Sequence, residues 1–175
     1  FEGWKLQDHF GELGGRTVGL LGYGAVPKIL HPILEALGAR VLYWSRSSRN
    51  ADFDRILGES DILSLHLPLT PETEKLVDPR HMKRGAILVN TARGGLVDET
   101  ALIDALQKGH LCAAGLDVFA VEPLPAGHRL LALPNVVCAP HVAWLTQETL
   151  ERSIGVAWEN VRRLAEGRQL QHRVA

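Results

Sequence analysis

The sequence predicts an α/β fold built on a doubly wound parallel sheet. Six apolar runs alternate with segments of helical pattern along the 175 residues, and each run is nearly continuous, as in strands that are buried on both faces. Strand and helix alternation at this spacing implies right-handed crossovers between parallel strands. The predicted strands are residues 16–22, 41–44, 61–67, 86–90, 111–118 and 135–139.

Helices are expected between these strands and after the last one. Pro32 falls inside the first of them and predicts a kinked or shortened helix, because a lost hydrogen bond and a ring clash cost about 3 kcal/mol or more. The expected helices are 25–37, a short one near 53–57, a turn at 79–84, and those at 99–107 and 146–166, with stop signals at Gly38, Gly109 and Gly167.

Composition indicates one domain with one substantial core, since 46% of the residues are hydrophobic. A net charge of −1 gives no basis for binding nucleic acid, and no apolar stretch is long enough for a membrane span. Cys112 and Cys138 lie in predicted strands without paired spacing. They are expected to be small core residues in a reducing compartment, which predicts a cytoplasmic location.

A glycine loop follows the first strand and opens the first helix. The first glycine permits a tight turn, and the second allows a pyrophosphate to approach the backbone amides. Pro27 stands at the usual third glycine, where it suits a first helical turn but adds bulk. A glycine turn without a ligand is the alternative. The candidate cofactor residues here are Gly22, Tyr23, Gly24, Ala25 and Val26.

The segment after the second strand indicates which dinucleotide is bound. A ribose-binding carboxylate is typical there in NAD-binding domains, but no Asp or Glu occurs between Val41 and Asn50. Ser45, Arg46 and Ser47 instead offer donors to a 2′-phosphate. The sequence therefore predicts NADP as the preferred cofactor, with NAD possible, and a solvated loop with ordinary arginines as the alternative.

Three further motifs follow predicted strands: Asn90–Gly95, Asp117–Pro123 and Ala139–His141. A doubly wound sheet delivers residues just past its strand ends into one crevice, so an arginine, a glutamate and a histidine could meet there. Taken singly, each of these three residues could instead have a purely structural role. The three candidate catalytic residues are Arg93, Glu122 and His141.

Together with the glycine loop, these motifs resemble the cofactor domain of the D-2-hydroxyacid dehydrogenase family. The resemblance implies a Rossmann-type dinucleotide-binding domain acting on a 2-keto acid. In that role Arg93 would bind the substrate carboxylate, His141 would provide the proton, Glu122 would orient His141, and Asp117 would receive the nicotinamide carboxamide. The resemblance also implies cofactor contacts from Leu67, Pro68, Thr73, Thr91, Ala92 and His141.

The same family carries a substrate domain of about a hundred residues, a domain-sized unit that is absent from this sequence. Residues 1–13 resemble the remnant of the interdomain connector, and residues 168–175 the start of the return. The first residue is not Met and no charged-then-apolar leader precedes it, so the chain is expected to begin inside a longer gene product. The leading segment contains four apolar residues that predict a homodimer. They are Phe1, Trp4, Leu6 and Phe10.

The predicted function is an NAD(P)-dependent reductase or dehydrogenase for small 2-keto and 2-hydroxy acids, most like the glyoxylate and hydroxypyruvate reductases. His66 is expected to be structural. No metal site is expected, because no histidine pair has ligand spacing and no cysteine cluster exists. The alternatives are a phosphite-oxidising relative, a dinucleotide-sensing, corepressor-like protein without significant turnover, and a scaffold that binds no cofactor, which Pro27 and Pro32 suggest.

Overall fold

The computed structural model describes residues 11–47 and 49–173. They form two compact units, the first ending at Pro140 and the second beginning at His141, and each is described by itself. Phe1, Trp4, Leu6 and Phe10, on which the homodimer prediction rests, lie outside the described residues, as do most of the predicted connector and the last two residues of the predicted return. The homodimer and both of these assignments stay predictions.

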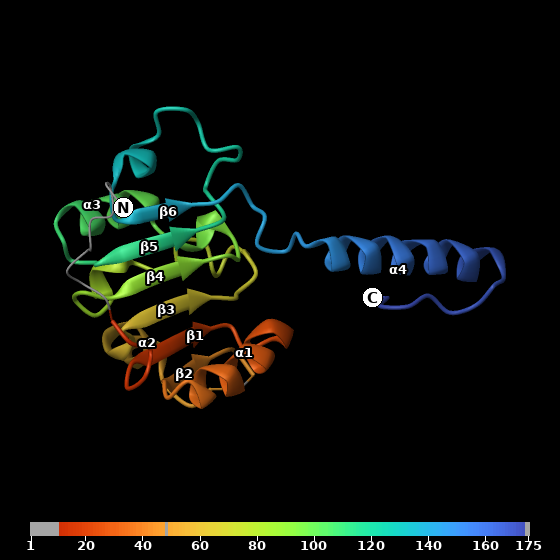
Figure 1. Ribbon diagram of the computed structural model, residues 1–175, viewed down its shortest axis with the longest axis horizontal. Helices are drawn as coiled ribbons and strands as arrows, with labels where there is room; N and C mark the ends of the chain where they lie inside the picture. Colours follow the sequence, from red (N-terminus) through yellow and green to blue (C-terminus); the bar gives the residue numbers. More distant parts are fainter. Residues whose placement is uncertain (1–10, 48, 174–175) are drawn as a thin grey trace, which may run out of the picture. The chain divides into compact units, whose positions relative to one another are not determined.

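The first unit contains a six-stranded, fully parallel sheet in the order β2-β1-β3-β4-β5-β6 (Figure 1). This confirms the predicted fold class. The strand order reverses between β1 and β3, which have β2 and β4 as their outer neighbours, and such a reversal opens a crevice at the carboxyl ends of the strands. The strands are β1 (Thr17–Leu21), β2 (Arg40–Trp44), β3 (Ile62–Leu65), β4 (Ile87–Asn90), β5 (Ala113–Leu116) and β6 (Val136–Cys138).

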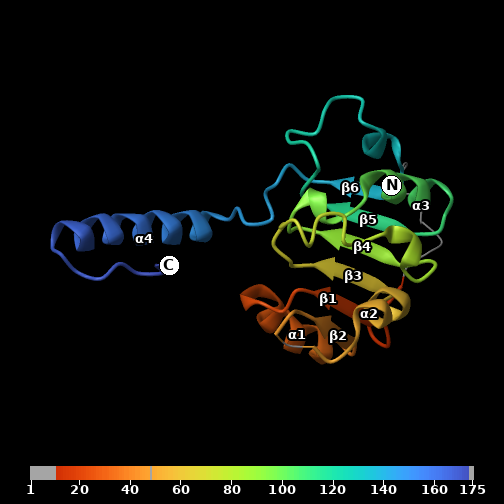
Figure 2. The same cartoon turned by 180° about the vertical axis from the view of Figure 1, so that it is seen from behind.

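Helices pack on both faces of this sheet, and the two faces are seen in turn in Figures 1 and 2. α1 (Ala25–Ala36) packs Leu34 against apolar residues of β1 and β2. On the opposite face, α2 (Phe53–Glu59) and α3 (Glu99–Gln107) join the larger core cluster. Three short 3-10 helices complete the unit, at η1 (Pro79–His81), η2 (Gly94–Leu96) and η3 (Arg129–Ala132).

The strands are not equally covered. All five residues of β1 are buried, as the near-continuous apolar run predicts. β4 and β5 instead alternate between buried and half-buried positions, and Val137 in β6 is 73% exposed. The prediction of burial on both faces is therefore wrong for these three strands within the described residues, because the smaller core cluster reaches only β1, β2 and the start of β3.

The prolines do not shorten α1. Pro27 is buried at the third helical position, where its missing N–H would have no intrahelical partner. The helix continues unbroken through Pro32 to Ala36, so it is not shortened there, and the kink that was the other predicted outcome stays a prediction. Pro32 lies at an exposed position, where a carbonyl that loses its amide partner can be hydrated instead.

The two cysteines are free thiols, but only one is partly buried. Cys112 is exposed and precedes β5, so the prediction that it is a core residue is wrong. Cys138 ends β6, and burial raises the pKa of its thiol. The alternating pattern of the run 111–118 places Leu111 in the core and turns the next side chain outward.

The second unit contains α4 (Gln147–Ala165), which confirms the long final helix. The Thr146 hydroxyl caps it by accepting a hydrogen bond of 3.1 Å from the Thr149 amide. No residue of α4 is buried, although its apolar residues recur at helical spacing. Within the described part of the chain, no helix is long and apolar enough to cross a membrane, and the cytoplasmic location stays a prediction.

Candidate cofactor and catalytic site

A pocket of about 360 Å³ opens at the carboxyl ends of β1, β2 and β3. It lies at the reversal of strand order, where doubly wound sheets bind ligands, and its size falls in the range of about 300–1,000 Å³ that is usual for small-molecule sites. Most of the predicted cofactor residues line it, and they are Gly22, Tyr23, Gly24, Ser45, Arg46, Ser47, Leu67, Pro68 and Thr73.

Glycine is required at position 22 because the backbone after β1 lies very close to the backbone after β3. Gly22 has φ +96°, and a Cβ atom there would lie 2.5 Å from the carbonyl oxygen of His66. A Cβ atom on Gly24 would meet nothing within 4 Å, and Gly24 caps α1 without a side-chain hydrogen bond. Ala25 and Val26, which were also predicted to bind the cofactor, do not line the pocket but follow Gly24 in the first turn of α1, which contains no acidic residue. This arrangement fits the diphosphate of a dinucleotide.

The tyrosine between the two glycines is anchored in the fold. Its ring stacks on Tyr43 with centroids 3.8 Å apart, and its hydroxyl lies 2.5 Å from Nδ1 of His31. Nε2 of His31 in turn lies 3.3 Å from the Glu35 carboxylate. Burial raises the pKa of Tyr23, so the phenol keeps its proton near neutral pH. Sequence reasoning missed this cluster, because strand β2 and helix α1 meet only in the folded chain.

The wall of the pocket at the end of β2 carries Ser45, Arg46 and Ser47. The facing segment is the turn after β3, where Thr70 and Glu72 also line the pocket. Neither of these two residues was among the predicted cofactor residues. Glu72 precedes Thr73 in the segment that the family resemblance places beside the cofactor, but nothing in the sequence places its side chain near the end of β2.

His66 lies at the end of β3 and lines the same pocket. The Ser64 hydroxyl lies 3.0 Å from its Nε2 atom, so the histidine has a side-chain partner that the sequence did not reveal. Burial lowers the pKa of His66, which keeps the ring neutral near pH 7. Among residues 11–47 and 49–173, no three His, Cys, Asp or Glu side chains are grouped as metal ligands.

Arg93 is carried by a loop that a buried amide holds in place. Asn90, at the end of β4, is 1% exposed. Its Oδ1 accepts a hydrogen bond of 3.0 Å from the Ala92 amide, and its Nδ2 donates one of 2.9 Å to the Arg93 carbonyl. The Arg93 guanidinium is exposed and donates to the Ala92 carbonyl at 2.6 Å. Thr91 and Ala92 belong to this loop and not to the residues that line the dinucleotide pocket.

Glu122 is carried by the next loop of the sheet. Its Oε1 accepts a hydrogen bond of 3.0 Å from the Phe119 amide, so the carboxylate is tied to its own turn. Asp117, at the start of this loop, is 5% exposed, and its amide donates to the Asn90 carbonyl at 3.0 Å. Asn90 therefore joins the end of β4 to the end of β5.

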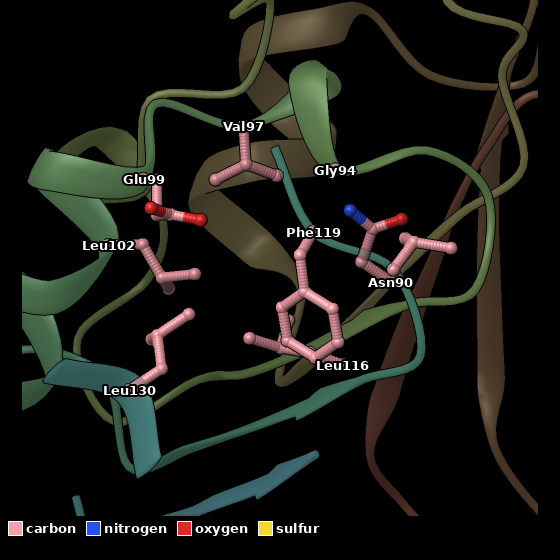
Figure 3. Close-up of a pocket in the computed structure, with 9 residues that line it drawn as sticks. Asn90, Gly94, Val97, Glu99, Leu102, Leu116, Phe119 and Leu130 are labelled. Atoms are coloured by element: carbon pink, nitrogen blue, oxygen red, sulfur yellow. The ribbon is translucent and has the colours of Figure 1, made fainter. Parts of the chain in front are cut away.

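The two loops also touch through Gly94. A Cβ atom at this position would overlap the backbone carbonyl of Phe119, so the backbones are in direct contact. Figure 3 shows Gly94 and Asn90 beside Phe119, whose ring points into a small pocket. The apolar residues that line that pocket are Val97, Leu102, Leu116, Val118 and Leu130, with Glu99 at its edge. The structure thus brings the loops of Arg93 and Glu122 together.

His141 is the first residue of the second unit and is described within it. Its φ of +56° is uncommon for a residue other than glycine, and its carbonyl accepts a hydrogen bond of 3.1 Å from Nε1 of Trp144. The meeting of His141 with Arg93 and Glu122 stays a prediction.

The sheet, the strand-order reversal and the open helix terminus define a Rossmann-type dinucleotide-binding domain. The chain belongs to the D-isomer specific 2-hydroxyacid dehydrogenase family, because residues 2–143 match the NAD binding domain of that family.

Individual relatives agree with this assignment. A glyoxylate reductase of Aeropyrum pernix is 45% identical over 95% of this chain and 54% of its own length. A D-lactate dehydrogenase structure with NAD⁺ from Lactobacillus jensenii has a TM-score of 0.88 and 35% identity, covering 98% of this chain and 59% of that one. A family member from Xanthobacter autotrophicus Py2, in complex with NADPH and MES, has a TM-score of 0.82 and 36% identity, covering 99% of this chain and 76% of that one. The chain spans about half the length of the curated relatives it matches.

Proposed function

We propose that the protein containing this chain is an oxidoreductase that transfers a hydride between NAD(P)H and a small 2-keto or 2-hydroxy acid, such as glyoxylate or hydroxypyruvate. The observation that carries the proposal is the contact between the loops of Arg93 and Glu122 on the sheet that also forms the dinucleotide pocket. Relatives named glyoxylate reductase, glycerate dehydrogenase and hydroxypyruvate reductase support it, and these names give no support to a corepressor-like protein.

Arg93 is proposed to bind the substrate carboxylate. Its guanidinium is exposed while its backbone is held by Asn90, so a permanent charge is presented from a fixed position. A planar guanidinium pairs with a carboxylate through two parallel hydrogen bonds and cannot lose its proton near neutral pH. These properties suit a residue that must both bind the acid and polarise the neighbouring carbonyl.

His141 is proposed to transfer the proton at the substrate oxygen, and Glu122 to orient it. Imidazole changes its charge near neutral pH, and a carboxylate at its other nitrogen fixes the tautomer and favours the protonated form. Asp117 is proposed to receive the carboxamide of the cofactor. When bound, the dinucleotide supplies or accepts the hydride.

The proposal is tested with the 175-residue chain itself. We expect it to bind a reduced dinucleotide but to reduce glyoxylate or hydroxypyruvate only slowly, because the chain spans about half the length of its relatives and we propose that the remaining part helps to exclude water and position the substrate. Binding is measured by nicotinamide fluorescence and turnover by its absorbance. Failure to bind either dinucleotide would contradict the proposed function, and rapid steady-state turnover would contradict the need for a second domain.

We further infer that NADPH is preferred over NADH. Ser45 stands where a carboxylate would repel a 2′-phosphate, and Arg46 and Ser47 line the same wall with a charge and a hydroxyl. One charge-assisted contact contributes about 1.5–3 kcal/mol, or about one to two orders of magnitude in affinity.

Arg46→Ala is therefore expected to weaken NADPH binding by about 10- to 100-fold and NADH binding far less. Ser45→Asp is expected to move the preference toward NADH, because it restores the ribose-binding carboxylate. Arg49→Ala is the matched control, since Arg49 follows closely in the sequence but does not line the pocket. Tighter binding of NADH than NADPH by the unmodified chain at physiological salt would contradict the preference.

A further inference from the structure

The positive charge of Arg46 shares its pocket with the negative charge of Glu72. Arg46 lines it from the end of β2, and Glu72 lines it from the turn after β3. We infer that Glu72 is a specificity-determining residue that disfavours the 2′-phosphate of NADPH and so limits the preference created by Arg46. The inference rests on the proposed dinucleotide binding and concerns only the choice between the two cofactors.

The turn that carries Glu72 is held by a short hydrogen-bond network. The Thr73 hydroxyl donates to the Pro68 carbonyl at 2.7 Å and accepts from the Thr70 amide at 2.7 Å. The Thr73 and Glu74 amides donate to the Thr70 carbonyl at 3.0 and 2.9 Å. Glu72 is therefore fixed at its backbone next to Pro68 and Thr73, two residues that also line the pocket.

The Glu72 carboxylate is charged near neutral pH. The Thr70 hydroxyl, the residue's own backbone amide and the positive charge of Arg46 all lower its pKa. Arg46 and Glu72 thus attract each other within the pocket that both line. Their opposite charges offset one another for a ligand that binds near both.

A 2′-phosphate carries up to two negative charges, whereas the 2′-hydroxyl of NADH carries none. The phosphate must compete with Glu72 for Arg46 and also approaches the carboxylate itself. Both effects weaken NADPH binding relative to NADH binding. Because both side chains are exposed to solvent, salt screens these interactions.

The test compares Glu72→Gln with the unmodified 175-residue chain. The substitution removes the charge and keeps the shape. The ratio of the NADH Kd to the NADPH Kd is expected to rise by about three- to tenfold at low salt, and by less at about 0.15 M ionic strength. Both constants are measured by fluorescence titration, and far-UV circular dichroism verifies the fold. Glu72→Ala provides a second variant with the same expected direction.

Glu74→Gln is the matched control. Glu74 is exposed on the same turn but does not line the pocket, so its neutralisation is expected to change the ratio less than about twofold. An unchanged ratio in both Glu72 variants, or an equal change in the Glu74 variant, would overturn the inference while leaving the proposed function intact. Absence of binding of either dinucleotide to the unmodified chain would overturn both.

Discussion

His141→Ala is expected to lower turnover of glyoxylate or hydroxypyruvate by about 10²–10⁴-fold in a full-length protein that contains this chain. The loss follows if the imidazole transfers the proton at the substrate oxygen, because general acid–base catalysis by a positioned side chain contributes a factor of this size. Dinucleotide affinity is expected to fall far less. Steady-state kinetics gives the first quantity, and fluorescence titration gives the second.

His172→Ala is the control for this experiment. His172 also lies in the second unit and also has a positive φ, +52° against +56° for His141, so removal of its imidazole tests for a general effect of the substitution. Equal losses of turnover and of cofactor affinity in the His141 variant would contradict its assignment as the proton donor. So would a comparable loss in the His172 variant.

Gly94→Ala is expected to destabilise the first unit by about 3 kcal/mol, at the upper end of the usual cost of overpacking. The added methyl group would overlap the Phe119 carbonyl, and a backbone neighbour cannot rotate away as a side chain can. The loops of Arg93 and Glu122 would have to separate to relieve the overlap. The free energy of unfolding in urea measures the effect.

Gly115→Ala is the control for Gly94→Ala. Gly115 lies in β5, close to the same loop, and a Cβ atom there would meet nothing within 4 Å. Its substitution is expected to change the free energy of unfolding by less than about 1 kcal/mol. If Gly94→Ala unfolds at the same urea concentration as the unmodified chain, the backbone contact does not hold the two loops together.

Sequence pattern predicted the elements of the first unit well, because periodicity and end signals are local. The run of strand β1 and the alternation of strands with helices α1 and α3 are visible without any tertiary contact. In the second unit, Thr146, which caps α4, and Gly167, which follows the helix, also mark its ends locally. The motif positions of Arg93 and Glu122 at strand ends follow from the same pattern.

The errors arose where exposure depends on distant parts of the chain. Cys112 is exposed although it belongs to the apolar run 111–118. Val137 is exposed because it lies on a face of the sheet that the smaller core cluster does not reach. A single apolar run does not reveal which of its faces receives a helix.

The sequence by itself determined the parallel α/β class, the order of the elements and the glycine loop that opens the dinucleotide pocket. Only the tertiary structure decided that Gly94 touches Phe119, that Tyr23 stacks on Tyr43, and that Glu72 shares a pocket with Arg46. Each of these contacts joins segments from different strands. Local patterns encode burial and turns, whereas such contacts depend on strand order and register, which are fixed only when the whole sheet assembles.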